Sequence, residues 1–108
     1  AHFSDCILVF HNAMLDWGFL KLALKNAGIT QRPKLIIDTL QIEKKRLLKH
    51  SSDIKLDDLT LNECRKRYGL PSYHCHHAVT YAQATAELLL AQCHQISAGK
   101  ELKVGELT

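Results

Sequence analysis

The chain has 108 residues, enough for one small domain, and its 14 Lys and Arg residues against 11 Asp and Glu residues give a formal net charge of +3. Hydrophobic residues make up 46% and charged residues 23%, which excludes a disordered chain and a collagen-like repeat. The longest apolar run, from Cys6 to Phe10, is too short to span a bilayer, so no membrane partner is expected.

The first predicted element is a strand in the run from Cys6 to Phe10, which is apolar and β-branched. Such a run is typical of a strand buried on both faces. A helix over residues 15–26 follows, with apolar residues at helical spacing and Gly28 where a helix C-cap falls. Because their neighbours in this helix are apolar, we expect Trp17 and Phe19 in the core rather than in a base-stacking surface.

A second strand is predicted over residues 35–37. Asp38 and Thr39 then offer an N-cap for a helix over residues 40–49. A strand–helix–strand unit implies a parallel pair with a right-handed crossover. Two strands are few for a sheet, so we expect that something further completes it.

The second half of the chain predicts two more helices. Asp57 or Thr60 caps a short helix that runs through Arg67. The longest helix runs from residue 78 to about 96, and the last residues, 99–108, are expected to be a flexible tail. The apolar side of the long helix is expected at Val79, Ala82, Ala86, Leu89, Leu90 and Cys93.

The four cysteines contain no Cys-x-x-Cys pair, which argues against a zinc ribbon or a redox pair. Their density is also too low for a disulfide-rich secreted scaffold. The chain does not open with a charged-then-apolar leader. We therefore expect free thiols and a cytoplasmic protein.

Two basic runs allow a contact with a phosphate backbone. The first is residues 44–46 with Lys49 and His50, and the second is residues 65–67. The alternative interpretation, which the mild overall basicity favours, is a pair of solvated helix faces.

Candidate site residues follow the first predicted strand directly. His11 and Asn12 stand at its carboxyl end, where open α/β sheets bind ligands. Asp16 falls in the first turn of the next helix, where a carboxylate either caps the helix or ligates a hard cation.

A second candidate segment, residues 73–77, leads into the long helix and holds His74, Cys75, His76 and His77. These residue types favour soft metals, but adjacent residues cannot all converge on one ion, so a dedicated zinc site is not expected. A histidine at a helix entrance can instead serve as a general base. His74 and His77 are expected on the surface.

Taken together and in this order, these segments resemble the DEDDh 3′–5′ exonucleases, the proofreading (epsilon) subunit of bacterial DNA polymerase III and its relatives. Residues 11–16 resemble the second exonuclease motif, residues 59–71 the helix before the third motif, and residues 76–82 the third motif itself. The resemblance covers residues 6–92. It implies an α/β fold, a partial ribonuclease H-like fold with two short parallel strands and about four helices. This fold would form a partial exonuclease-like domain over residues 1–98.

The resemblance also implies a chemistry. The family hydrolyses phosphodiesters with two divalent cations, Mg²⁺ or Mn²⁺, that four carboxylates hold while a histidine activates water. Asp16 matches the metal-binding carboxylate of the second motif, and His76 matches the general base. His11 and Asn12 would flank them and contact nucleic acid.

One position departs from this pattern. The carboxylate of the third motif should stand five residues after His76, where this chain has Tyr81. A phenol, with an ordinary pKa of about 10, is a poor ligand for magnesium. A related variant with a catalytic tyrosine keeps an aspartate four residues later, and that position is Thr85 here. Tyr81 is expected to bond to His76 or to fill the metal site.

Residues 1–5 hold neither the Asp-x-Glu of the first motif nor the three strands that precede the strand from Cys6 to Phe10 in the family. We therefore expect a chain related to replication and proofreading but catalytically inactive, with no cofactor. Its open strand edge, from Cys6 to Phe10, is expected to form a homodimer or to pair with a different chain that supplies the missing strands. The alternatives are a fragment of an active enzyme, a non-catalytic module that binds single-stranded nucleic acid or protein, and a pure oligomerisation unit.

Overall fold

The computed structural model of the chain describes residues 6–30, 32–74 and 77–98, and only the backbone of residues 13–16. The expected tail, residues 99–108, and His76 lie outside the described residues. The elements follow the predicted order, with one additional 3₁₀ turn: β1 (Ile7–Phe10), α1 (Ala13–Asn26), β2 (Leu35–Asp38), α2 (Thr39–Leu48), the 3₁₀ turn (Leu56–Leu59), α3 (Leu61–Arg67) and α4 (Ala78–Ser97).

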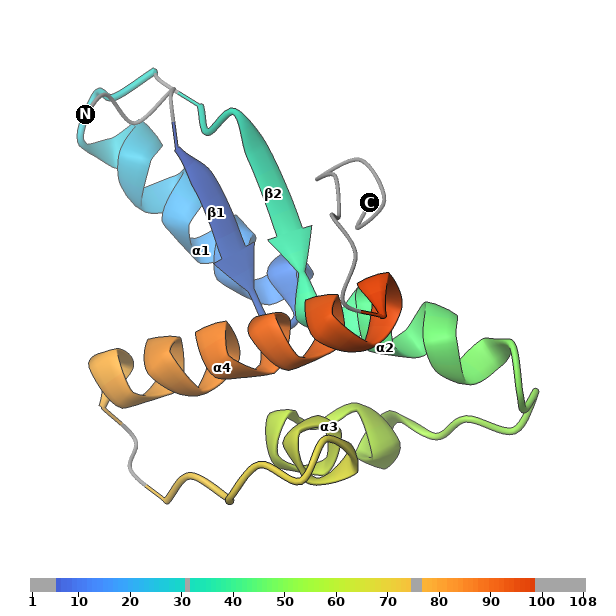
Figure 1. Cartoon of the computed structure of the whole chain (residues 1–108). Helices are drawn as coiled ribbons and strands as arrows, with labels where there is room; N and C mark the ends of the chain where they lie inside the picture. Colours follow the sequence, from blue (N-terminus) through green and yellow to red (C-terminus); the bar gives the residue numbers. More distant parts are fainter. Residues whose placement is uncertain (1–5, 31, 75–76, 99–108) are drawn as a thin grey trace.

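The two strands form the predicted parallel pair. Ile7 lies opposite Leu35, and Phe10 lies opposite Asp38, so both strands end at the same edge. α1 is the crossover between them, while α4 runs across the end at which both arrows point (Figure 1). The coarse expectation of an α/β fold with two parallel strands and four helices is confirmed.

Burial of the first strand and of its following helix differs from the prediction. β1 is half-buried rather than buried on both faces, and Ile7 is exposed. Trp17 is half-buried, and Phe19 is 75% exposed, so its placement in the core was wrong. The physical reason is that the described residues contain only two strands, which offer α1 too little surface to cover its apolar side chains.

The core lies among the helices instead. Leu61 and Cys64 of α3 pack against Ala84 and Leu88 of α4. Three half-buried tyrosines surround this cluster: Tyr68, Tyr73 and Tyr81. None of the described helices, α4 included, is long and apolar enough to cross a membrane.

The prediction of which residues of α4 face the core was wrong. Val79 and Leu90 are exposed, and the buried stripe consists of Ala84, Thr85, Leu88 and Gln92. Two of these four residues are polar, and each makes a hydrogen bond: the Thr85 hydroxyl donates to the Tyr81 carbonyl over 3.0 Å, and Gln92 Nε2 donates to the Thr39 carbonyl over 3.0 Å. Hydrophobicity alone therefore selects the wrong face.

Local capping signals are confirmed. The Asp38 carboxylate accepts from the Leu40 amide over 2.9 Å, and the Thr60 hydroxyl accepts from the Glu63 amide over 3.3 Å. Gly28 has a φ of +75°, a left-handed conformation that glycine adopts without strain, at the end of α1. These caps set the ends of three helices.

Within the basic run at residues 65–67, Arg65 is buried and does not form part of a solvated face. Arg65 is 3% exposed; its Nε donates to the Pro71 carbonyl over 3.0 Å, and its Nη1 donates to the Ala84 carbonyl over 2.7 Å. Arg65 Nη1 also lies 3.0 Å from Glu87 Oε1. Arg65 thus joins α3 to α4 as a structural residue, and Lys66 is exposed.

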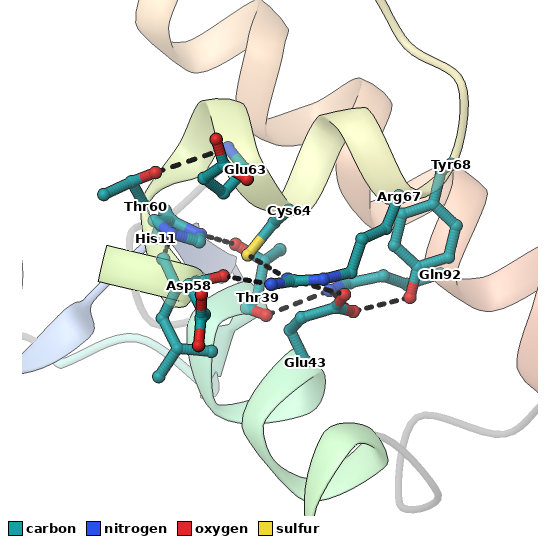
Figure 2. Close-up of polar contacts among 11 residues, drawn as sticks. His11, Thr39, Glu43, Asp58, Thr60, Glu63, Cys64, Arg67, Tyr68 and Gln92 are labelled. Atoms are coloured by element: carbon teal, nitrogen blue, oxygen red, sulfur yellow. Dashed lines mark hydrogen bonds and ion pairs between the residues drawn. The ribbon is translucent and has the colours of Figure 1, made fainter. Parts of the chain in front are cut away.

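A buried carboxylate ties three helices together (Figure 2). Glu43 of α2 is 2% exposed. Its Oε2 accepts from Arg67 Nη1 over 3.2 Å, and its Oε1 accepts from the Tyr68 hydroxyl over 2.6 Å. Gln92 Nε2 of α4 lies 3.4 Å from the same Oε1. Ionic and polar contacts therefore supplement the small apolar core.

The buried thiol of Cys64 predicts a loss of stability in alkali. Burial first, and the charge of Glu43 second, raise the pKa of Cys64 to about 12, although Arg67 lowers it. Above pH 9 the unfolded chain releases a thiol proton that the folded chain keeps, so stability falls as pH rises. We expect this thiol to lower the free energy of unfolding by roughly 1 kcal/mol between about pH 9 and about pH 10.

Urea denaturation at the two pH values measures this change. The Cys64→Ser variant is the control, because its hydroxyl does not titrate in this range and its stability should fall less steeply. Equal slopes in the two proteins would contradict the assignment to Cys64.

Candidate functional site

The carboxyl ends of β1 and β2 meet at one edge of the sheet. Asp38 Oδ1 accepts hydrogen bonds from the backbone amides of Asn12 and Leu40, each over 2.9 Å. The Thr39 hydroxyl lies 3.2 Å from the Phe10 carbonyl. This edge is where open α/β sheets bind ligands, and it is fixed by bonds between residues far apart in sequence.

The His11 side chain is buried and hydrogen-bonded to other segments rather than exposed (Figure 2). Its Nε2 lies 2.7 Å from the Leu59 carbonyl, and its Nδ1 lies 2.8 Å from the Thr39 hydroxyl. Because a carbonyl can only accept, Nε2 carries a proton. A contact with nucleic acid stays a prediction, and the ring would have to give up one of these bonds to make it.

Asn12 occupies the N-cap position of α1 in a left-handed conformation, with a φ of 74°. Asparagine tolerates this conformation better than most residues do. Its side chain makes no capping bond, and it is half-buried at the edge. Asp16 is the fourth residue of α1, so it is not the N-cap; its side chain lies outside the described part of the structure.

Tyr81 reaches this edge from α4. Its hydroxyl donates to the His11 carbonyl over 3.0 Å. Its ring centroid lies 6.0 Å from that of Tyr73, edge to face at 78°. The position that the resemblance assigns to a carboxylate is thus a phenol that is hydrogen-bonded to the end of β1. Its relation to His76 stays a prediction, because His76 is not described. His74 and His77 are exposed, as expected.

These residues surround a pocket of about 420 Å³. Its lining is mostly apolar and aromatic: His11, Asn12, Leu40, Leu56, Leu59, Thr60, Leu61, Tyr73 and Tyr81. We call it the edge pocket. Tyr73 and Tyr81 offer aromatic surface in this lining on which a flat aromatic ring can pack.

Sequence reasoning placed His11, Asn12 and Tyr81 at this site but missed the wall formed by Leu56, Thr60 and Tyr73. Leu56 is 85% exposed, and an exposed leucine beside a helix start carries no distinctive pattern. Tyr73 is the first residue of the histidine-rich segment, but nothing in the sequence indicated that it lines a pocket.

Metal-ligating side chains at this edge can be assessed only for the described residues. No group of three or more His, Cys, Asp or Glu side chains in the described ranges is arranged to hold a metal ion. At this edge, Asp38 uses Oδ1 for two backbone amides. Asp16 and His76 remain predicted family residues whose side chains are not described.

Most of the chain is similar in sequence to part of a known protein. The chain is 36% identical over 87 residues to the 3′–5′ exonuclease DinG of Staphylococcus aureus, with the same values for strains USA300, COL and N315. The match covers 81% of this chain and 9% of those proteins, so the chain spans about a tenth of the length of these curated relatives. No protein-family model and no solved structure matches. The chain is thus related in sequence to a 3′–5′ exonuclease.

Removal of the Tyr81 hydroxyl should loosen the link between α4 and β1. We expect Tyr81→Phe to lower the free energy of unfolding by about 1 kcal/mol, because the His11 carbonyl loses its donor while the ring stays in place. Chemical denaturation measures this loss. Tyr73→Phe is the matched control, since the Tyr73 hydroxyl makes no hydrogen bond within the described residues; an equal loss in both variants would contradict a specific role for Tyr81.

Proposed function

We propose that this chain is an exonuclease-related module that binds the end of a single-stranded nucleic acid in the edge pocket without hydrolysing it. The similarity to a 3′–5′ exonuclease supports the nucleic-acid class. The observation that carries the absence of hydrolysis is the bond between the Tyr81 hydroxyl and the His11 carbonyl. It leaves a neutral phenol where the family resemblance requires a carboxylate for catalysis.

The finer assignment is part of the same proposal. We assign the chain to the DNA polymerase III epsilon type, with a partial ribonuclease H-like fold and a cytoplasmic role related to replication and proofreading. The order of the motifs supports this, together with the parallel β1–β2 pair that α1 connects. In an active relative, Asp16 and His76 would take the metal-binding and general-base roles.

The chemistry of the edge pocket favours a base over a phosphate. A nucleobase would pack against the Tyr73 ring, while the Asn12 amide and the Thr60 hydroxyl lie in the same lining and offer donors and acceptors. Stacking on one aromatic side chain contributes about 1–3 kcal/mol per base and tolerates any sequence. Weakly sequence-dependent binding follows.

Binding to a fluorescent single-stranded oligonucleotide tests the proposal. Tyr73→Ala should weaken binding by roughly five- to a hundredfold, because it removes the stacking ring. Tyr73→Phe keeps the ring and should bind as the parent does. Leu90→Ala, an exposed position outside this pocket, controls for general effects.

The same oligonucleotide, incubated with the chain and Mg²⁺ or Mn²⁺, tests the expected inactivity. We expect it to stay intact. Shortening from its 3′ end by the purified chain would overturn the inactive assignment and favour an active enzyme. Equal binding by the parent and Tyr73→Ala would overturn the assignment of the edge pocket.

A second candidate function is a non-catalytic dimerisation module. Within the described residues, β1 pairs with β2 alone, which occupies one of the two edges of β1. Ile7 at that strand is 40% exposed. Exposed apolar edges pair with other chains, and we propose that the strand from Cys6 to Phe10 pairs with its copy in a homodimer.

Light scattering across a concentration series tests the dimer. We expect a mass of twice 12.2 kDa for the parent chain. Ile7→Lys should give a monomer, because a charge at an isologous edge faces its own copy. Val79→Lys, which changes another exposed apolar residue, should remain dimeric. A monomeric parent at every concentration would contradict the candidate.

A further inference from the structure

A second cavity lies where the C-terminal ends of α2 and α3 meet the last turns of α4. Its volume is about 430 Å³. Four basic side chains line it, and they come from two segments that are distant in sequence: Arg46, Lys49, His50 and Arg67. We call it the basic cleft. It shares no lining residue with the edge pocket.

The charge of the basic cleft is not balanced within the described residues. The one carboxylate in its lining is Glu43, which is buried and already accepts from Arg67 and Tyr68. Neither Arg46 nor Lys49 takes part in an ion pair in the described part of the chain. Three permanent cations against one carboxylate leave two positive charges, before any contribution from His50.

Cations near helix C-termini ordinarily stabilise the helix, because each C-terminal end carries roughly half a negative charge. Two such ends meet here, α2 at Leu48 and α3 at Arg67. Together they offset roughly one positive charge. About one unit of positive charge still faces the cavity, so stabilisation of the helices does not account for the whole cluster.

Hydrogen bonds hold two residues of the lining, Tyr68 and Arg67, in place. The Tyr68 hydroxyl is held by Glu43, and the Arg67 guanidinium is held by Glu43 and, through Nη2, by the Asp58 carbonyl at 2.5 Å. These bonds fix two lining residues before a ligand arrives. Side chains that are already held in place lose less conformational entropy on binding than mobile surface side chains do.

We propose that the basic cleft, centred on Arg46 and Lys49, is a binding site for a phosphate group, separate from the edge pocket. Tyr81 lines one site and Gln95 the other, and both lie on α4. At 1.5 Å per residue the helix separates them by roughly 20 Å. The phosphate belongs either to a nucleic-acid backbone or to a free phosphate ion. The inference stands independently of the proposed function.

The experiment compares two double variants with the same change in charge on the same helix. Arg46→Gln with Lys49→Gln removes the two cations of the basic cleft that form no ion pair with a described residue. Lys44→Gln with Lys45→Gln is the matched control, because both lysines are exposed and neither lines the cavity. The probes are a single-stranded oligothymidylate, followed by fluorescence anisotropy at several salt concentrations, and inorganic phosphate, followed by backbone amide chemical shifts.

For a backbone phosphate, we expect the cleft variant to bind the oligothymidylate at least about fivefold more weakly than the parent. The slope of the logarithm of the binding constant against the logarithm of the salt concentration should also fall by roughly 1, since each phosphate contact on a single strand contributes about 0.7. The control should lose less than about twofold. For a free ion, inorganic phosphate should shift the amides around Arg46 saturably in the parent and the control, but not in the cleft variant. The site is overturned if both variants weaken equally, or if neither probe distinguishes them.

Tyr73→Ala separates this result from the proposed function. A cleft-dependent loss of binding that persists in the Tyr73→Ala background would support the basic cleft even if the edge pocket plays no part. A loss in Tyr73→Ala alone, with the cleft variant unchanged, would support the edge pocket and overturn the basic cleft as a nucleic-acid contact.

Discussion

The buried carboxylate of Glu43 is the constraint on which the helical layer depends. A charge that is 2% exposed is stable only when its partners replace water, and here Arg67 and Tyr68 of the α3 end supply them. Removing one partner of such a buried pair costs about 3–5 kcal/mol, a large share of the stability of a small domain. Burial first, and then the hydrogen bond to Glu43, raise the pKa of Tyr68, so the phenol stays protonated and keeps donating.

The same constraint reaches the candidate site through a continuous set of contacts. Gln92 lies beside Glu43 and donates to the Thr39 carbonyl. The Thr39 hydroxyl bonds with the ring of His11, whose carbonyl accepts from Tyr81. The edge pocket is therefore positioned by the helical core as much as by the sheet. This explains why a two-stranded sheet, which offers little burial of its own, still holds its carboxyl edge in a defined arrangement.

The fold was predicted well where the signal is local. Asp38 and Thr60 cap helices because their side chains reach amides two or three residues away, which a short pattern can encode. Burial was predicted poorly where it depends on distant partners. Gln92 enters the core because Thr39 and Glu43, about fifty residues away, accept its amide, and no helical periodicity reveals that.

Phe19 shows the opposite error. Its apolar spacing correctly marks a residue that would gain from burial, but a pattern cannot say whether a surface exists to cover it. Residues of the candidate site were likewise predictable only where local sequence or strand order determines their position. His11 and Asn12 could be placed at the carboxyl edge, because strand order alone determines that edge. Tyr73 and Leu56 could not, because they reach the pocket from segments whose path only the folded chain defines.

The two cavities offer different chemistries to a nucleic acid. The edge pocket is apolar and aromatic, so it can hold a base. The described residues of its lining include no Lys or Arg to replace the counterions of a phosphate, and release of these counterions supplies most of the non-specific affinity for nucleic acids. The basic cleft has the charge but only Tyr68 as an aromatic residue, and that hydroxyl is held by Glu43. Because α4 joins them rigidly, a polymer that reached both would gain from each without ordering a flexible linker. A free nucleotide could use one site at a time, so the length of the ligand should govern affinity more than its sequence.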